Sequence, residues 1–206
     1  MSNQNYRDSS LDLYVSQING YSVLDRQAEQ KLGQRVKERG DMRAAHKLVL
    51  ANLRFVVKVA HEYRGYNLPL LDLIQEGNLG LTMAVKRFDP DKGYRLISYA
   101  VWWIRAYINK YIMRSWSLVK IGTTQAQRKL FFKLRSLREE AERAAAPGET
   151  VHVEQIAERL GVSEKEVTNM EMRLGARDFS LQTELSPETK NTYLERLVDH
   201  GETQED

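Results

Sequence analysis

Proline residues divide this chain into long stretches in which apolar residues recur with helical spacing. Proline occurs only at positions 69, 90, 147 and 187, and it ends helices because it lacks an amide hydrogen and clashes with the preceding turn. Between the prolines, apolar residues repeat every three or four positions, and no alternating strand pattern is evident. We therefore predict an all-α protein with helices over residues 41–63, 70–88, 93–115, 124–146, 152–160 and 163–174.

Several classes of protein are excluded or disfavoured by simple sequence features. The 206 residues include no cysteine, which excludes disulfides and thiolate-bound metal. The first ten residues, MSNQNYRDSS, have no apolar core like that of a signal peptide, and no apolar run approaches membrane-spanning length. The histidines at positions 46, 61, 152 and 200 show no spacing typical of catalysis or metal binding. We expect a cytoplasmic protein without membrane association that is not an enzyme and needs no metal or cofactor.

The distribution of charge points to a polyanionic partner. The formal net charge is only +3, but the segment from Lys92 to Arg138 contains eleven basic residues and no acidic residue. A basic run is most often one side of a solvated helix, yet such helices usually carry acids as well. A segment of this length with cations alone favours binding to nucleic acid.

The segment GYRLISYAVWWIRAYINKYI, residues 93–112, is unusually rich in aromatic residues. At about 100° per residue, one helical face carries the aliphatic residues Ile97, Val101, Ile104, Ile108 and Ile112. The opposite face carries Tyr99, Trp102 and Trp103, extended by the cations Lys110 and Arg114. These aromatics either pack under another domain or at a protein interface, or they stack on unpaired bases, and the neighbouring cations favour base stacking. Tyr107 and Tyr111 lie nearer the aliphatic side and are predicted to be core residues.

The residues from Asn52 to Ile108 resemble region 2 of bacterial sigma factors, the promoter-recognition subunits of RNA polymerase. The resemblance is most specific in DLIQEGNLGL, residues 72–81, and YAVWWIR, residues 99–105. A further segment, QRKLFFKLR at 127–135, resembles a short box of the heat-shock branch of that family. The resemblance implies a helical region 1.2/2 domain over 1–119, a small three-helix region 3 domain over 120–177, and an extended acidic linker over 178–206.

In the family, region 2 melts the −10 element of the promoter and holds its non-template strand. The resemblance gives Tyr99 the role of stacking on the adenine where melting starts, and it places Trp102 and Trp103 against the upstream edge of the bubble. The full set implied to contact the single strand is Asn52, Phe88, Asp89, Lys92, Tyr94, Tyr99, Trp102 and Trp103. The set expected to contact phosphates or duplex DNA is Arg105, Asn109, Lys110 and Arg114.

The same resemblance implies partners. Asp72, Gln75, Glu76 and Asn78 match the surface that docks on the coiled coil of the largest subunit of core RNA polymerase. Without the resemblance, these residues would be interpreted as an ordinary solvated helix face. Chaperones or proteases are further candidate partners, as regulators of the protein. Ala106 and Asn109 depart from the residues that read a −10 base pair in housekeeping members, so a different −10 sequence is expected.

The second half of the chain gives weaker signals. AERLGVSEKEV, residues 157–167, is typical of a helix-turn-helix in which Gly161 forms the turn and Ser163 caps the second helix. That helix carries the acids Glu164, Glu166 and Glu171, so we interpret it as scaffold rather than as a DNA-reading helix. Thr124 and Gln127 stand where the family reads the extended −10 motif, and they do not match it.

The last 29 residues, from Asp178, include eight acids and two bases, which predicts an extended or disordered tail. Such a tail is either a plain linker or, by resemblance, the sigma finger, with Glu184 and Glu188 near the template strand. The chain ends before any segment resembling region 4, so a fragment or a truncated member is expected.

Three functions remain open at this point: a sigma factor that works only with polymerase, a free-standing single-stranded nucleic-acid binder, and an enzyme. Unstacking a base costs a few kcal/mol, and stacking it on an aromatic ring returns about 1–3 kcal/mol. Two captured bases therefore leave little surplus for opening DNA, which favours a protein that acts together with polymerase. The enzyme has the least support, because no catalytic arrangement of residues is evident.

Overall fold

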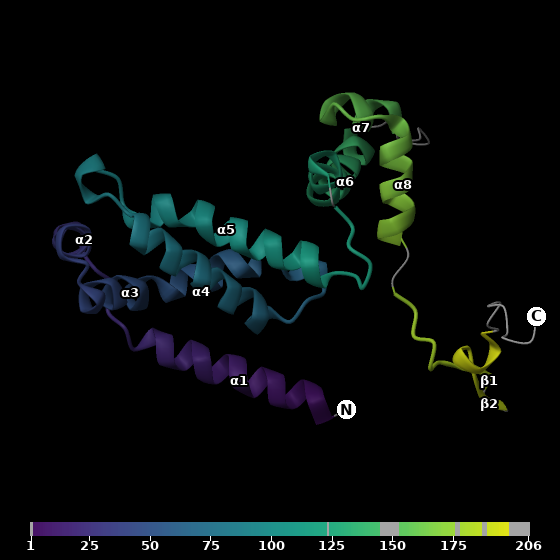
Figure 1. Ribbon diagram of the computed structural model, residues 1–206, viewed down its shortest axis with the longest axis horizontal. Helices are drawn as coiled ribbons and strands as arrows, with labels where there is room; N and C mark the ends of the chain where they lie inside the picture. Colours follow the sequence, from purple (N-terminus) through teal and green to yellow (C-terminus); the bar gives the residue numbers. More distant parts are fainter. Residues whose placement is uncertain (1, 123, 145–152, 176–177, 187–188, 198–206) are drawn as a thin grey trace, which may run out of the picture. The chain divides into compact units, whose positions relative to one another are not determined.

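The computed structural model describes residues 2–122, 124–144, 153–175, 178–186 and 189–197. The chain divides into two units, Met1–Trp116 and Ser117–Asp206 (Figure 1). The predicted all-α class is confirmed, because eight α-helices account for most of the described residues. Among these residues, no helix is long and apolar enough to cross a membrane.

The first unit consists of five helices and two short 3-10 turns. The helices are α1 (Ser2–Asn19), α2 (Arg26–Arg39), α3 (Met42–His61), α4 (Leu70–Arg87) and α5 (Leu96–Ser115), and the turns are η1 (Arg64–Tyr66) and η2 (Pro90–Lys92). Helices α3, α4 and α5 match their predicted positions to within three residues. Helices α1 and α2 were not predicted, because few apolar residues recur regularly between residues 2 and 39.

Local sequence explains where α2 and α3 begin and end. The Asp25 carboxylate accepts a hydrogen bond of 2.6 Å from the amide of Ala28 and caps α2. Gly40 ends α2 with φ of 60°, a left-handed conformation that glycine adopts without steric cost. Asp41 then accepts hydrogen bonds from the amides of Arg43 and Ala44 and starts α3. These side chains satisfy amide groups that have no partner within the helix.

The core of the first unit lies between α3, α4 and α5, which pack side by side (Figure 1). Its largest fully buried side chains include Leu48, Val56, Leu73, Ile74, Leu81, Ile104, Ile108 and Ile112. A Cβ added at Gly80 would lie 2.7 Å from the carbonyl oxygen of Trp103, and one at Gly77 would lie 2.6 Å from a methyl carbon of Val56. The two glycines of the DLIQEGNLGL segment therefore allow α4 to approach its neighbours closely.

The buried face of α5 differs partly from the predicted face. Ile104, Ile108 and Ile112 are fully buried as expected, but Ile97 and Val101 are only half-buried. Leu96 and Ala100 are buried in their place, and the backbone amide of Leu96 is hydrogen-bonded to Glu29 of α2, a helix that was not predicted. Tyr107 and Tyr111 are half-buried rather than core residues.

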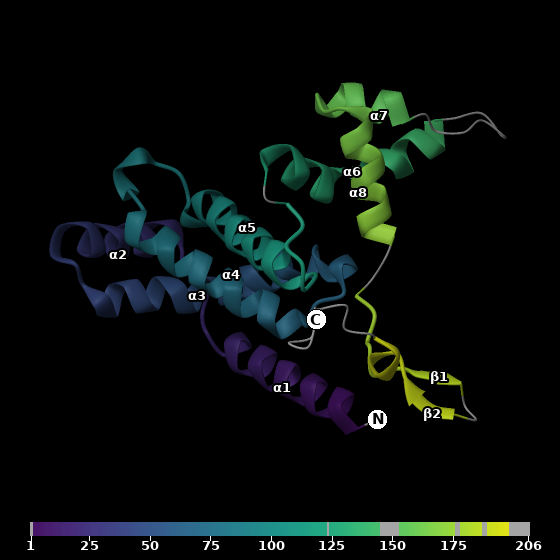
Figure 2. The ribbon, with the colours of Figure 1, turned by 45° about the vertical axis from the view of Figure 1, so that its right-hand side comes forward.

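The second unit contains α6 (Gln125–Ala144), α7 (Val153–Leu160) and α8 (Glu164–Gly175), which pack against one another (Figure 2). Their shared core consists of Leu130, Phe131, Leu134, Ile156, Ala157, Leu160, Val167 and Met170. Gly161 forms the turn between α7 and α8 with φ of 64°, and the hydroxyl of Ser163 accepts from the amide of Glu166. The predicted turn and cap are thus confirmed. The predicted end of the first helix at Pro147 lies outside the described residues.

The tail contains two short strands that were not predicted. Strand β1 (Glu184–Ser186) pairs antiparallel with β2 (Thr189–Thr192), and the 3-10 turn η3 (Leu194–Arg196) follows. Strands of three and four residues are too short to show an alternating pattern, although the β-branched Thr189 and Thr192 favour β2. Residues 198–206 of the expected extended segment lie outside the described residues.

Candidate nucleic-acid interface and partner surface

Four aromatic rings form a continuous row along the end of α4, the following loop and the first two turns of α5. The ring centroids of Phe88 and Tyr94 are 6.1 Å apart, those of Tyr94 and Tyr99 are 6.1 Å apart, and those of Tyr99 and Trp103 are 6.3 Å apart. We call these four residues the aromatic row. The contacts are edge-on or tilted rather than parallel, which is the geometry that aromatic pairs prefer. The row therefore brings together four of the eight residues expected to contact single-stranded DNA.

The two adjacent tryptophans have different surroundings. Trp102 is 71% exposed, whereas Trp103 is half-buried and belongs to the aromatic row. The guanidinium of Arg87, at the end of α4, lies 4.8 Å from the centre of the Trp103 ring. Successive side chains on a helix point about 100° apart, and in this fold that separation leaves one ring in solvent and the other in the aromatic row. Trp102 is thus the residue of the pair that presents its ring to solvent.

Two of the expected base-contacting residues are buried. Phe88 is 6% exposed, and its ring lies against Gly33 of α2. Asn52 is also buried, and its amide nitrogen donates a hydrogen bond of 2.7 Å to the carbonyl of Leu48 on its own helix. In this structure both residues contribute to packing beneath the surface, and contact of either with a base stays a prediction.

The loop between α4 and α5 carries charged residues that are paired with α2. The ammonium of Lys37 donates hydrogen bonds of 2.7 Å to both Asp89 and Asp91. The hydrogen bond from Lys37 is the main reason why the pKa of Asp89 is lowered from its ordinary value. Lys92 is exposed in the same loop, and Tyr94 is exposed beside Tyr99.

The residues expected to contact phosphate are not equivalent in the structure. Lys110 is exposed on the side of α5 that carries Trp102. Arg105 forms an ion pair of 3.0 Å with Glu62, and Arg114 lies 3.7 Å from Glu76, one of the expected polymerase-docking residues. Asn109 is half-buried, and its side-chain oxygen is buried without a hydrogen-bond partner. Lys110 is therefore the residue of this set that the structure leaves best suited to bind a phosphate.

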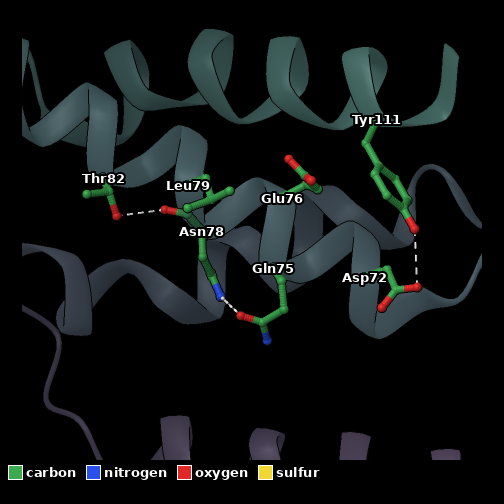
Figure 3. A pocket seen from close by; sticks show the side chains of 7 residues that line it. All are labelled: Asp72, Gln75, Glu76, Asn78, Leu79, Thr82 and Tyr111. Carbon is green, nitrogen blue, oxygen red and sulfur yellow. Dashed lines mark hydrogen bonds between the residues drawn. The ribbon is translucent and has the colours of Figure 1, made fainter. Parts of the chain in front are cut away.

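The expected polymerase-docking residues lie together in a pocket of about 480 Å³ on α4 and the end of α5 (Figure 3). The pocket is lined by Asp72, Gln75, Glu76, Asn78, Leu79, Thr82 and Tyr111. Hydrogen bonds connect these side chains to one another: Tyr111 donates to Asp72 at 3.2 Å, and Asn78 donates to Gln75 at 3.1 Å. The amide of Asn78 also donates to the hydroxyl of Tyr14 on α1 at 3.0 Å. The sequence pattern thus predicted a set of residues that the fold brings to one place.

The pocket has an acidic character. Burial raises the pKa of the Tyr111 hydroxyl, and the neighbouring Asp72 carboxylate raises it further. Carboxylates beside an aromatic ring suit the side chains of arginine and lysine, which form charge-assisted hydrogen bonds with the acid and stack on the ring. The side-chain oxygen of Asn78 is buried without a hydrogen-bond partner. Chemically, the pocket is suited to basic residues of a partner.

In the second unit, the residues singled out in the sequence have structural partners. Thr124 accepts from the amide of Gln127, and Gln127 accepts from the amide of Thr124, so the two form a capping box at the start of α6. Glu171 forms an ion pair of 2.7 Å with Arg138 of α6. Glu184 lies in β1, and Glu188 lies outside the described residues. Within the described part of the chain, no cluster of three or more acids or histidines could bind a metal ion.

Comparison with known proteins agrees with this architecture. The family model for Sigma-70 region 2 matches residues 48–117. The RNA polymerase sigma-C factor of Myxococcus xanthus is 54% identical over 187 residues, which cover 90% of this chain and 63% of that protein. The sigma-B factor of the same organism is 55% identical over 159 residues, 77% of this chain and 65% of that protein. RNA polymerase sigma factor RpoH of Caulobacter vibrioides is 46% identical over 202 residues, 97% of this chain and 68% of that protein.

The chain belongs to the family of RNA polymerase sigma factors. The similarity to RpoH proteins, 45–46% identical over most of the chain, supports the heat-shock type within that family. The resemblance inferred from the sequence is therefore confirmed. Sigma factors are initiation factors and not enzymes, as predicted for this chain. The alternative of a free-standing nucleic-acid binder finds no support among these relatives. The chain spans 63% and 65% of the length of the two Myxococcus relatives.

Proposed function

We propose that this chain binds core RNA polymerase and directs transcription initiation at heat-shock promoters by recognising and melting the −10 element. The observation that carries the proposal is the exposed Trp102 ring beside the aromatic row. A large exposed ring makes few packing contacts within the protein, so stacking on a base disrupts little of the fold. We assign residues 1–119 to polymerase docking and melting, 120–177 to region 3, and 178–206 to an acidic linker. The protein would act in the cytoplasm, with chaperones or proteases as candidate regulators.

DNA melting is assigned to the aromatic surface. Tyr94 and Trp102 are exposed and Tyr99 is half-buried beside Tyr94. We assign stacking on the unpaired bases of the non-template strand to these three rings, and each stacked base contributes about 1–3 kcal/mol. Lys92 and Lys110 are exposed near the ends of this surface and suit its phosphates. Because unstacking costs a similar amount, capture of a few bases would shift opening only when polymerase supplies the remaining free energy.

Polymerase docking is assigned to the acidic pocket of Asp72, Gln75, Glu76 and Asn78. The proposed partner is the coiled coil of the largest subunit, presenting basic side chains. The described part of the first unit offers two separate surfaces in this way: the pocket on α4 and the end of α5, and the aromatic surface at the other end of α5. Separate surfaces allow one protein to bind polymerase and DNA at the same time.

The test is promoter opening by core polymerase reconstituted with the chain, followed through a fluorescent base analogue in the −10 element. Trp102→Ala should reduce the equilibrium of opening by roughly 5- to 150-fold, the equivalent of one stacked base. Met42→Ala is a matched control, because Met42 is also 71% exposed but lies at the start of α3. A template with a preformed bubble should partly rescue Trp102→Ala.

Two results would contradict the proposal. Opening that is unchanged by Trp102→Ala would remove the role of the exposed ring. Tight binding of the chain to single-stranded DNA without polymerase, together with no binding to core polymerase, would instead support the free-standing binder.

A further inference from the structure

One face of α2 contacts the loop between α4 and α5 from its first turn to its last. Arg26, Glu29, Gly33 and Lys37 all lie within an arc of about 80° on the helix. Each contacts a different part of segment 88–96, which we call the recognition loop because it connects the members of the aromatic row. The guanidinium of Arg26 donates a hydrogen bond of 2.7 Å to the carbonyl of Gly93.

The contact with the most hydrogen bonds is made by the buried carboxylate of Glu29. Glu29 is 3% exposed and accepts hydrogen bonds of 3.0 and 3.2 Å from the guanidinium of Arg95. The same carboxylate accepts a hydrogen bond of 2.9 Å from the amide of Leu96, the first residue of α5. An acid at a helix N-terminus is favourable, because it compensates free amide groups and the helix dipole. Glu29 thereby fixes the point at which the recognition loop becomes α5.

The middle of α2 approaches the recognition loop without a side chain. A Cβ added at Gly33 would lie 3.1 Å from the Cβ of Pro90 and 3.2 Å from a ring carbon of Phe88. Glycine therefore allows the loop and the first ring of the aromatic row to pack directly on the helix. This contact explains why Phe88 is buried, although the sequence indicated a surface residue.

The last turn of α2 neutralises two acids of the recognition loop. Lys37 donates hydrogen bonds of 2.7 Å to Asp89 and to Asp91, while its own side chain remains 45% exposed. Beside the proposed DNA surface, two uncompensated carboxylates would repel phosphates. With Lys37 in place, the local charge of the three groups is −1 rather than −2, and both carboxylates are directed toward α2.

We propose that α2 holds the recognition loop in the conformation that binds DNA, and that Lys37 is a positioning residue that makes the two acids of this loop compatible with DNA binding. The proposal rests on the proposed function, because it assigns α2 a part in promoter binding. Lys37 acts through Asp89 and Asp91 and not by contact with DNA. The cation, rather than the length of the lysine side chain, is the feature required.

The experiment measures the affinity of the chain, assembled with core polymerase, for a duplex promoter fragment. Lys37→Met should weaken binding by about twofold to tenfold, the range expected for the loss of one or two exposed ion pairs. Lys31→Met is the matched control, because Lys31 is exposed on the same helix and its removal changes the net charge equally. Lys37→Arg should bind like the unchanged protein. Adding Asp91→Asn to Lys37→Met should restore most of the affinity, and the double-mutant cycle measures this coupling.

A second measurement needs no DNA. NMR titration of the free chain should show that the pKa of Asp89 rises toward its ordinary value in Lys37→Met, since the hydrogen bond from Lys37 is the main cause of the lowered value. The backbone amide signal of Asp91, which donates to Asp89, should shift as well. An unchanged pKa of Asp89 in Lys37→Met would overturn the contact between Lys37 and the recognition loop itself.

The results separate the inference from the proposed function. Equal affinities of Lys37→Met and Lys31→Met would overturn the role of Lys37, even if the unchanged protein opens promoters. A loss in Lys37→Met that Asp91→Asn does not restore would also overturn it, because Lys37 would then bind DNA directly. If the unchanged protein and polymerase fail to bind the promoter, the proposed function fails, and the titration of Asp89 still decides whether Lys37 positions the loop.

Discussion

The guanidinium of Arg87 lies over the ring of Trp103, with 4.8 Å between its central carbon and the ring centroid. The contact joins the last turn of α4 to the second turn of α5 and covers one face of the Trp103 ring. A cation over an aromatic face contributes about 0.5–1 kcal/mol at an exposed site. Trp103 is therefore held in one orientation by its neighbours, while Trp102 is exposed.

We expect Arg87→Ala to release Trp103 and to reduce promoter opening by about two- to fivefold, the equivalent of the lost cation–π contact. Lys86→Ala removes a neighbouring exposed cation and serves as the control for charge. The orientation of the ring can be followed by tryptophan fluorescence after Trp102 and Trp116 are replaced by phenylalanine. An emission spectrum that Arg87→Ala leaves unchanged would show that the contact does not hold the ring.

Gly80→Ala should destabilise the first unit by about 1–3 kcal/mol, the usual cost of overpacking. The added Cβ would lie 2.7 Å from the carbonyl oxygen of Trp103 and 2.9 Å from the Cα of Ile104, and backbone atoms cannot move away as a flexible side chain can. Gly175→Ala at the end of α8 is the control, because nothing lies within 4 Å of its added Cβ. Thermal unfolding measures both. Equal melting temperatures for the two variants would contradict the close approach of α4 and α5.

Asp41 should give the protein a stability that depends on pH. The amide of Ala44, followed by the guanidinium of Arg35, lowers the pKa of the Asp41 carboxyl from its ordinary value of 3.8. A carboxyl whose pKa is lower in the folded than in the unfolded state stabilises the fold above the unfolded value, and this contribution is lost as the pH falls through the folded value. Asp41→Ala should therefore lower the melting temperature by a few degrees at pH 7 and much less near pH 3. A difference that stays constant with pH would exclude the ionised cap.

Lys110 and Arg114 should respond differently to replacement by alanine, although the sequence predicted the same role for both. Lys110→Ala should lower the slope of log affinity for DNA against log salt concentration by about one. Arg114→Ala should lower it less, because Arg114 lies beside Glu76 and over the ring of Tyr111. Equal decreases would show that Arg114 leaves Glu76 when DNA binds.

Glu76→Arg should reduce binding to core polymerase at least tenfold while the fold is retained. The change places a second cation beside Arg114 and reverses the charge of a pocket that we propose to bind basic side chains. Glu158→Arg makes the same change of charge at an exposed position of α7 and should leave binding unaffected. Binding can be measured by co-purification and unfolding by circular dichroism. A folded Glu76→Arg variant with normal polymerase binding would show that the pocket is not the docking surface.

The sequence was sufficient to predict α3 to α8, because each has a regular apolar face and most end near glycine or proline. It did not predict α2, whose exposed face is strongly charged, although Asp25 and Gly40 mark its two ends. Because α2 was not predicted, the burial of Phe88 was not predicted either, since Phe88 packs against Gly33 of that helix. The grouping of Asp72 with Glu76 on one surface was implied by the resemblance to the sigma family, whereas the approach of Tyr111 and Arg114 required knowledge of how α4 and α5 pack.

The close contact at Gly80 also has a mechanical consequence. With the backbone of α5 directly against that of α4, there is no compressible layer of side chains at this point, and the two helices cannot slide past each other without a clash. A displacement of α4 at the acidic pocket would therefore move α5, and Trp102 with it, as one rigid body. With the proposed docking, polymerase would then determine the position and orientation of the Trp102 ring relative to DNA. A bulkier residue at position 80 would change this position and orientation without altering either surface.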